Sequence, residues 1–151
     1  SFSSMSFAHL THLNEHGFSA ENSVFISAPK AQIWDALMNK IDKWWPKDHT
    51  WWGDEGTLTL QPVAGGCFCE SAGDNSAEHM RISFIQVNSL LRMTGGLGPL
   101  QGMGVHGALN WQFTQQDNNI TKLILTYQAH GVIKGDFAKL APIVDRVQNS
   151  Q

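Results

Sequence analysis

The spacing of hydrophobic residues changes repeatedly along the chain, and each spacing indicates one kind of element. Residues 17–27 end in a run of β-branched and aromatic residues, which predicts a strand. Helical spacing follows, with apolar positions at Ile33, Trp34, Leu37 and Ile41. Together with Pro29, which suits the first turn of a helix, this spacing predicts a helix over 29–39 and a short helical turn over 41–45.

Between residues 57 and 130 hydrophobic and polar residues alternate, which is typical of strands with one buried face. Turns rich in Gly, Asp and Asn at 73–75 and 117–119 separate successive strands. The apolar positions on the predicted buried faces are Leu58, Leu60, Met80, Ile82, Phe84, Leu109, Trp111, Phe113, Leu123, Leu125 and Tyr127. We therefore predict about six strands here, paired in an antiparallel sheet.

The last segment returns to helical spacing and predicts a C-terminal helix, with apolar positions at Phe137, Leu140, Val144 and Val147. The order of strand, two short helices, strands and helix indicates an α+β fold. We expect a helix-grip arrangement, in which a curved antiparallel sheet of about six to seven strands wraps around the C-terminal helix. Residues 1–16 are polar and rich in histidine, so we expect a frayed N-terminal arm there and a single domain over 17–151.

Composition narrows the functions that this chain can carry. Charged residues are 15% of its 151 residues, below the roughly 25% of an average chain, and the net charge is −3. Such a chain lacks the basic face that binds nucleic acid, so we expect no nucleic-acid partner. No apolar run approaches the roughly 18 residues of a membrane-spanning helix, so we expect no membrane span. We expect a cytoplasmic protein, while the start at Ser1 rather than Met leaves export open.

Tryptophan is concentrated in one part of the chain, where five of the six tryptophans lie between residues 34 and 52. Four of them form two adjacent pairs, and adjacent side chains cannot all face one core. Some of these rings are therefore expected at a cavity, a rim or a contact surface; the alternative is a loop that folds back and buries them. Our candidates for ligand contact are Trp44, Trp45, Trp51, Trp52, Trp111 and Tyr127.

Glu70, Glu78 and His79 are the polar residues best suited to proton chemistry. The hairpin turn between them brings Glu78 or His79 across from Glu70. A carboxylate beside an imidazole orients it for proton transfer, and an apolar cavity would raise the pKa of the carboxyl so that it acts as an acid. The alternative is a cross-strand pair on the solvent face, which the alternation of His79 with Met80 favours. Candidate catalytic residues are Glu70, His79 and His49.

Two other motifs resemble known sites without completing them. Cys67 and Cys69 lack the second cysteine pair of a zinc site and are too close in sequence for an unstrained disulfide, so we expect free thiols, no metal and no cofactor. The glycine-rich run 95–107 lacks the Lys and Ser or Thr of a phosphate-binding loop. We expect a flexible loop instead, or a bulged connection between strands. The tryptophan loop (residues 43–53) and the glycine loop (residues 95–104) are our candidates for a cavity mouth.

Several short motifs together resemble a known family. The pattern Ser27-Ala-Pro-x-x-x-Ile33-Trp34-x-x-Leu37 opens the first predicted helix. Further motifs are Trp44-Trp45-Pro46, His49-Thr50, Gly65-Gly66-Cys67-Phe68-Cys69-Glu70, Glu78-His79 and Gly95-Gly96-Leu97-Gly98-Pro99-Leu100. Over residues 18–147 the chain resembles the START-like superfamily, also called SRPBCC or Bet v 1-like, nearest to uncharacterised bacterial proteins related to polyketide cyclases and Hsp90-ATPase-activator-like domains. The resemblance implies a helix-grip fold around a hydrophobic cavity, and no single reaction.

Three hypotheses about function follow from these features. The first is the binding of a small hydrophobic or aromatic ligand between the sheet and the C-terminal helix. The second is an enzyme with cyclase- or hydrolase-like acid–base chemistry in the same cavity. The third is a protein-interaction domain that uses an exposed tryptophan loop, with a second copy of itself or with another protein. We expect ligand binding rather than catalysis.

Overall fold

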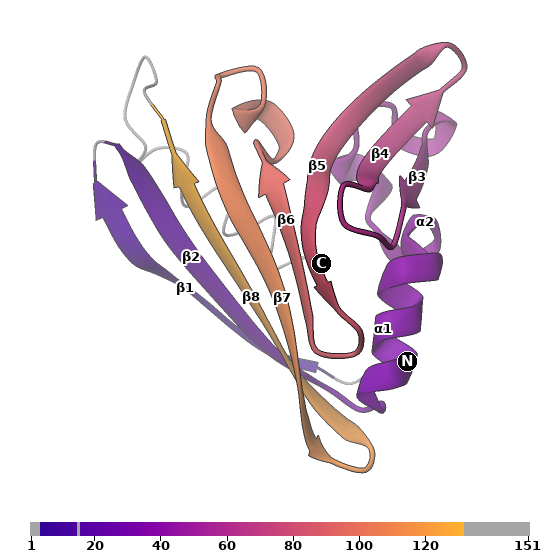
Figure 1. Ribbon diagram of the computed structural model, residues 1–151, viewed down its shortest axis with the longest axis vertical. Helices are drawn as coiled ribbons and strands as arrows, with labels where there is room; N and C mark the ends of the chain where they lie inside the picture. Colours follow the sequence, from indigo (N-terminus) through magenta and orange to yellow (C-terminus); the bar gives the residue numbers. More distant parts are fainter. Residues whose placement is uncertain (1–3, 15, 132–151) are drawn as a thin grey trace.

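The structure of the protein, a computed structural model, describes residues 4–14 and 16–131, with side chains described from residue 16 onward. Its eight described strands form one antiparallel sheet in the order β1-β2-β8-β7-β6-β5-β4-β3 (Figure 1). The strands are β1 (Ser4–Asn14), β2 (Gly17–Ile26), β3 (Thr57–Leu60), β4 (Cys67–Ala72), β5 (Asn75–Gln86), β6 (Leu90–Gly95), β7 (His106–Asp117) and β8 (Ile120–His130). Most pairings join neighbours in sequence, and the pairing of β2 with β8 brings the two halves of the chain together.

Two helices follow β2 and lie at the β3 end of the sheet (Figure 1). The helical elements are α1 (Lys30–Asn39), α2 (Ile41–Trp44) and the 3-10 turns η1 (Lys47–His49), η2 (Gly53–Glu55) and η3 (Gly98–Leu100). In α1 the buried stripe includes Trp34, whose ring packs edge-on against Phe113 of β7 at 5.3 Å between centroids. The chain leaves α2 because Trp45 is extended before Pro46. The two predicted helices are therefore confirmed.

Most of the segment expected to be a frayed arm is a strand, so that expectation is wrong for Ser4–Asn14. β1 pairs with β2 from Ser4 opposite Ile26 to Asn14 opposite Gly17. A bulge between Leu10 and His12 breaks the alternation of hydrophobic and polar residues, which hid the strand in the sequence. Over residues 4–14 and 16–131 the sheet consequently has eight strands rather than the six or seven expected.

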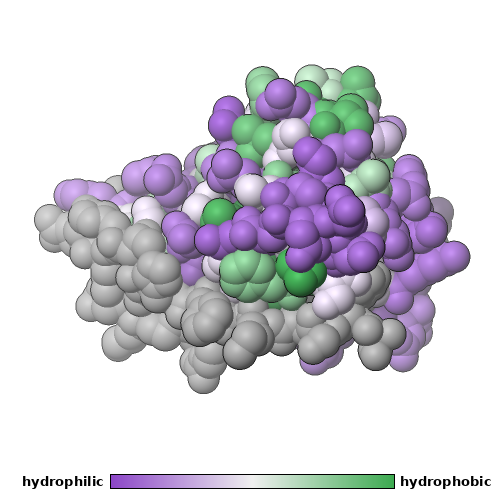
Figure 2. Space-filling view, turned by 90° about the horizontal axis from the view of Figure 1, so that it is seen from below, coloured by the Kyte–Doolittle hydropathy of each residue, from purple (hydrophilic) through white to green (hydrophobic). Residues whose placement is uncertain are grey.

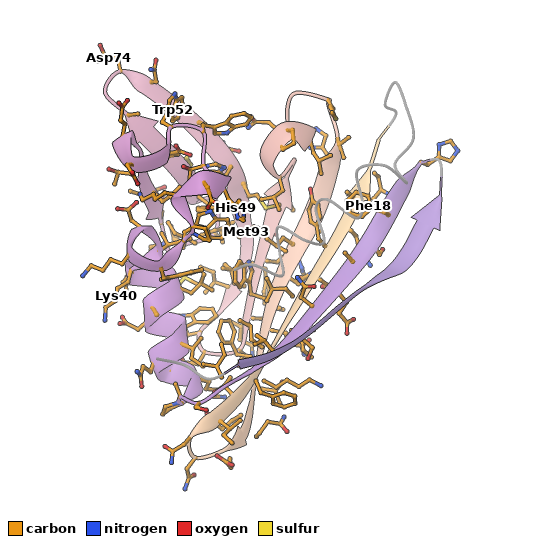
Figure 3. The ribbon with its side chains drawn as sticks, turned by 180° about the vertical axis from the view of Figure 1, so that it is seen from behind. Phe18, Lys40, His49, Trp52, Asp74 and Met93 are labelled. Carbon is orange, nitrogen blue, oxygen red and sulfur yellow. A yellow bond between two sulfur atoms is a disulfide. The ribbon has the colours of Figure 1, made fainter. Side chains whose placement is uncertain are left out.

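One face of the sheet carries the hydrophobic core. Alternate residues of the strands are buried there together with the inner face of α1. Met93 of β6 is fully buried in this core, between the strands and the helices (Figure 3). On the face seen from below, the coloured residues are mostly hydrophilic, with hydrophobic residues in separate groups (Figure 2). Among the residues whose side chains are described, the exposed large hydrophobic ones are Trp51, Val63, Phe84, Val87, Met103 and Ile120.

Phe84 lies outside the core, contrary to the predicted pattern. The register of β5 against β6 shifts between Ile82 and Phe84, so Ser83 is an extra residue and the alternation of faces is interrupted. Phe84 is 42% exposed, and the guanidinium of Arg92 lies 5.4 Å from the centre of its ring. The cation therefore covers part of a ring that the bulge turns toward solvent.

The described residues have the α+β class that the sequence predicts, with two helices after β2 and a curved antiparallel sheet. The predicted C-terminal helix falls at residues 132–151, outside the described residues. Among the described helices none is long and apolar enough to cross a membrane.

Candidate functional site

A buried carboxylate anchors the tryptophan loop to the sheet. Glu70 lies on β4 and is only 1% exposed. The backbone N–H of Trp51 donates to its Oε1 at 3.0 Å, and that of Trp52 donates to its Oε2 at 2.8 Å. Gly56 passes so close that a Cβ at this position would lie 2.5 Å from Glu70 Oε2. The carboxylate therefore holds the loop through both of its oxygens. A residue larger than glycine at position 56 would take the space that the carboxylate occupies.

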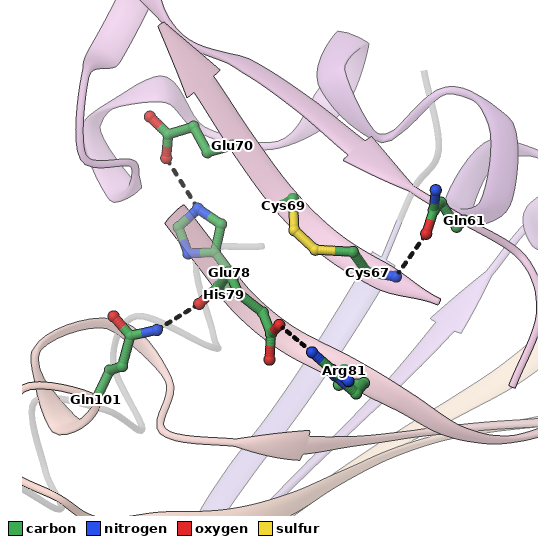
Figure 4. The surroundings of a disulfide bond; sticks show 8 residues. All are labelled: Gln61, Cys67, Cys69, Glu70, Glu78, His79, Arg81 and Gln101. Carbon is green, nitrogen blue, oxygen red and sulfur yellow. Dashed lines mark hydrogen bonds and ion pairs between the residues drawn. A yellow bond between two sulfur atoms is a disulfide. The ribbon is translucent and has the colours of Figure 1, made fainter. Parts of the chain in front are cut away.

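His79 provides a third hydrogen bond to Glu70. Its Nε2 lies 2.8 Å from Glu70 Oε1, and both side chains are buried (Figure 4). The register of β4 against β5 shifts between Phe68 and Cys69, which makes His79 the extra residue of a β-bulge. For this reason His79 and its neighbour Met80 are both buried. Strict alternation favoured a cross-strand pair of Glu70 with His79 on the solvent face, and that prediction is therefore wrong.

The three hydrogen bonds keep Glu70 ionised. Burial alone would raise the pKa of Glu70, but the bonds from the backbone amides of Trp51 and Trp52 and from His79 outweigh it and lower this pKa below its ordinary value. The expectation of a raised pKa for Glu70 is therefore wrong. Because a carboxylate only accepts hydrogen bonds, Nε2 of His79 carries the proton between them. Nδ1 is then the ring nitrogen that can take up or release a proton.

Four aromatic rings form a continuous chain from the β-bulge to α2. The distances between ring centroids are 5.1 Å for His79–Phe68, 5.3 Å for Phe68–Trp45 and 5.7 Å for Trp45–Trp44. The indole N–H of Trp44 donates to the carbonyl of Ala36 at 2.8 Å, and that of Trp45 donates to the carbonyl of His49 at 3.5 Å. Trp45 is buried and Trp44 is half-buried against the core, so this pair is closer to the alternative in which the loop folds back over its rings. The indole N–H of each ring is bonded to the backbone.

Solvent reaches the second tryptophan pair more readily than the first. Trp51 is 47% exposed, while Trp52 is half-buried. His49 lies just before them in η1, half-buried, with Nε2 4.0 Å from the carboxylate of Asp48. His49 therefore lies on the tryptophan loop, and His79 lies on β5. The loop and His79 are linked through Glu70, which is hydrogen-bonded to both.

Tyr127 and Gln101 fasten the glycine loop. The buried Tyr127 hydroxyl accepts a hydrogen bond from the Leu97 N–H at 3.2 Å and donates one to the Gly95 carbonyl at 3.4 Å. Burial raises the pKa of Tyr127, so the hydroxyl keeps its proton. The Gln101 amide donates to the Glu78 carbonyl at 2.5 Å (Figure 4). Both candidate mouth loops are consequently attached to the β-bulge at 78–79, one through Glu70 and the other through Gln101.

Trp111 carries a buried donor that no described residue accepts. It is 3% exposed on β7, opposite the buried residues Leu91 of β6 and Leu125 of β8. Its indole N–H has no hydrogen-bond partner among the described residues. Such groups are rare, because an unpaired buried donor costs about 1–3 kcal/mol. The sequence marks Trp111 as a candidate for ligand contact, but no pattern of residues shows whether a buried N–H finds an acceptor.

Cys67 and Cys69 are joined in a disulfide, so the expectation of free thiols is wrong. Their Cα atoms are 5.4 Å apart, within the range that a disulfide spans. Residues two apart in a strand point to the same face, and here both sulfurs lie on the face of β4 opposite Phe68 and Glu70. In this bridged form the two sulfurs are not thiolate ligands for a metal.

A separate hollow of about 350 Å³ lies near the end of the sheet where β6, β7 and β8 meet the glycine loop. Its lining residues are Thr94, Gly95, His106, Gly107, Ala108, Gln128 and His130. His106 and His130 are directly opposite one another in register and are both exposed. No sequence pattern revealed this hollow, because only cross-strand register brings its residues together.

Comparison with known proteins shows the fold. No protein-family model and no curated protein matches this sequence. The structure is similar to a conserved protein of unknown function, EF2215 from Enterococcus faecalis, with a TM-score of 0.65 and 16% identity over 94% of this chain and 72% of that chain. It is also similar to Mll3558 from Rhizobium loti, with a TM-score of 0.57 and 15% identity over 97% of this chain and 92% of that chain.

A third similar structure is CalU16 from Micromonospora echinospora, with a TM-score of 0.55 and 14% identity over 85% of this chain and 72% of that chain. At such low identity a shared fold says nothing specific about activity. The open antiparallel sheet, the two helices after β2 and these likenesses show that the chain has an α+β helix-grip fold.

Proposed function

We propose that this protein binds a small, mostly apolar ligand that carries a hydrogen-bond acceptor, on the hydrophobic face of its sheet. The unpaired N–H of Trp111 is the observation that carries the proposal. A carbonyl or ether oxygen placed at this N–H would satisfy it, while the rest of the ligand contacts the apolar side chains beside it. Ligand sites commonly combine an apolar lining with a few such polar groups.

The resemblance of the sequence to START-like proteins supports this proposal. We place the chain in that superfamily, near the bacterial proteins related to polyketide cyclases, on the motifs named above and on a helix-grip fold. In this arrangement the tryptophan and glycine loops form the mouth, because both are attached to the same β-bulge. Trp51 and Trp52 contact the ligand at the mouth; Trp44, Trp45 and Tyr127 contribute apolar surface, since their polar atoms are bonded to the backbone.

The substitution Trp111→Phe tests the proposal, because it removes the N–H and keeps an aromatic ring. We expect the affinity for an aromatic ketone dye such as prodan to fall about five- to tenfold, the value of one hydrogen bond. Affinity for a naphthalene hydrocarbon without an acceptor should not fall. Fluorescence titration of both probes measures the two effects.

Trp44→Phe is the matched control, since its indole N–H is already bonded to the Ala36 carbonyl. It should lower the free energy of unfolding by about 1 kcal/mol and change the affinities for the ketone and for the hydrocarbon by the same factor, because only apolar contact is altered. Equal loss of ketone affinity in both variants, or no binding of either probe to the native chain, would contradict the assignment of Trp111.

Native mass spectrometry of gently purified protein identifies the chemical class of the natural ligand. We expect a co-purifying apolar molecule with at least one acceptor oxygen, released for mass analysis by organic extraction. A ligand-free mass together with no binding of the probes would instead favour the third hypothesis, a protein-interaction domain that uses Trp51.

Acid–base catalysis is a second candidate, and the hydrogen bond between Glu70 and His79 favours it. Glu70 would orient the imidazole, and Nδ1 would exchange the proton with a substrate at the mouth. If a reaction is found, His79→Ala should lower kcat by roughly 10²–10⁴-fold. The affinity of the same variant for prodan separates this loss from a loss of binding. Full activity in His79→Ala would remove the catalytic role.

A further inference from the structure

The Cys67–Cys69 disulfide does not cross-link segments that are distant in the sequence. In the chain-entropy account the stabilisation by a disulfide rises with the logarithm of the length of the loop that it closes, and this one encloses a single residue. Both sulfur-bearing residues are half-buried rather than enclosed, so a thiolate reagent can approach them. The bridge is therefore better suited to reversible chemistry than to stabilising the fold.

The surroundings of the disulfide distinguish its two sulfurs. Arg81 lies directly opposite Cys67 in register, and Glu78 lies directly opposite Cys69. The guanidinium and the carboxylate form an exposed ion pair at 2.8 Å beside the bridge (Figure 4). A thiolate on Cys67 would lie beside the positive group, whereas one on Cys69 would lie beside the negative group. Cys67 is consequently the better leaving thiolate.

The residue enclosed by the bridge connects it to the candidate site. Phe68 is fully buried on the opposite face of β4, where its ring contacts His79 at 5.1 Å and Trp45 at 5.3 Å between centroids. The next residue after the bridge is Glu70, which holds the tryptophan loop. The disulfide thus constrains the backbone of the same segment that positions this loop.

The spacing of Cα atoms indicates how reduction would act on this segment. Two residues of a regular strand span roughly 6.4–6.8 Å, whereas the Cα atoms of Cys67 and Cys69 are 5.4 Å apart. The shortened segment coincides with the register shift between Phe68 and Cys69. Without the bridge, β4 is free to extend at this point, and the extension would displace Phe68 and Glu70 relative to their partners.

We propose that Cys67 and Cys69 form a reversible thiol–disulfide centre that exchanges with dithiols and controls the attachment of the tryptophan loop. A thiolate of the dithiol attacks Sγ of Cys69, the S–S bond breaks, and Sγ of Cys67 leaves as a thiolate and takes up a proton. The second thiolate of the dithiol attacks the mixed disulfide, and Sγ of Cys69 leaves and is protonated. Two electrons pass to the protein, and the dithiol becomes its own disulfide.

The exchange is tested on the full chain with dithiothreitol as the dithiol. The protein is equilibrated in graded ratios of reduced to oxidised reagent, quenched with acid and alkylated, and the intact mass gives the number of free thiols. We expect folded protein to convert reversibly between no free thiols and two. Free thiols in every buffer, or a bridge that opens only in denaturant, would overturn the proposal. This measurement does not depend on any ligand, so its failure is distinct from failure of the proposed function.

The link to the loop is tested by hydrogen exchange of the Trp51 and Trp52 amides in the oxidised and reduced forms. We expect exchange at least about fivefold faster after reduction, with β8 amides unchanged as an internal control. The variant Cys67→Ala/Cys69→Ala should show the fast exchange in both buffers and no response to dithiothreitol. Equal exchange of the two loop amides in oxidised and reduced native protein would overturn this half of the proposal.

Discussion

At the scale of single residues, Glu70 shows how one buried charge organises a loop. A carboxylate without partners in the protein interior costs several kcal/mol, so it is found there only where donors meet it. The donors here come from two separate segments, the backbone of Trp51 and Trp52 on one side and His79 on the other. The charge therefore requires both segments to be in place at the same time.

Glu70→Gln should lower the free energy of unfolding at pH 7 by about 2–3 kcal/mol, because the amide removes the charge and presents an NH₂ group to a donor. Urea unfolding followed by circular dichroism measures the change. Glu55→Gln on η2 is the control, since this exposed residue lies in the same region. A loss no larger than that of the control would mean that the carboxylate does not anchor the loop.

The effect of Glu70→Gln should also depend on pH. The folded-state pKa of Glu70 is lowered, so its stabilisation is complete above the unfolded pKa of about 4.3 and disappears as pH falls through the folded value. The difference in unfolding free energy between native protein and variant should therefore shrink below about pH 4. A difference that stays constant down to acid pH would show that the hydrogen bonds do not depend on the charge.

At the scale of elements, the β-bulge in β5 joins the two loops of the candidate mouth. His79 is the extra residue of the bulge, and its side chain turns inward to meet Glu70. The carbonyl of the neighbouring Glu78 accepts a hydrogen bond from the Gln101 side chain. A regular strand would direct His79 to solvent and leave the tryptophan loop without this support. One inserted residue thus places the attachments of two distant loops next to one another.

Gln101→Ala should loosen the glycine loop without unfolding the sheet. The loss of one hydrogen bond predicts amide exchange about two- to tenfold faster in the loop, measured by mass spectrometry of peptides. Gln112→Ala, at an exposed position of β7, is the matched control and should leave this exchange unchanged. If both variants exchange at the native rate, the bond to Glu78 does not hold the loop.

At the scale of the whole molecule, β1 protects one edge of the sheet. β2 pairs with β1 on one side and with β8 on the other, so that its backbone groups are bonded in both directions. Exposed strand edges pair readily with other chains. Residues 4–14 therefore keep β2 from becoming an edge, a role that a frayed arm would not have.

Removal of residues 1–14 should expose β2 and promote self-association relative to the full chain. Light scattering coupled to gel filtration measures the mass in solution. Removal of residues 1–3, which precede β1, is the control and should not change the mass. If the longer truncation leaves both mass and stability unchanged, β1 contributes nothing to the integrity of the sheet.

The sequence predicted the elements whose period is unbroken. The helices after β2 follow from regular spacing, as do β8 and β7 as far as Gln115. A helix or strand buries one face whenever its hydrophobic residues recur at its own period. The prediction failed where bulges interrupt that period: at β1, at His79 and at Phe84. A bulge depends on the pairing of two strands, so a single strand's pattern does not reveal it.

The sequence by itself determined the α+β class, the two helices, most core residues of the predicted strands and the placement of Glu78 and His79 across a hairpin from Glu70. These properties follow from periodicity and turn chemistry, which act between residues close in the chain. Only the tertiary structure decided that Glu70 stays ionised, that the Trp111 N–H has no partner in the described part of the chain and that the glycine loop is attached beside His79. Each of these depends on which groups from distant segments meet in space, and hydrogen bonds and charges respond to those neighbours rather than to sequence order.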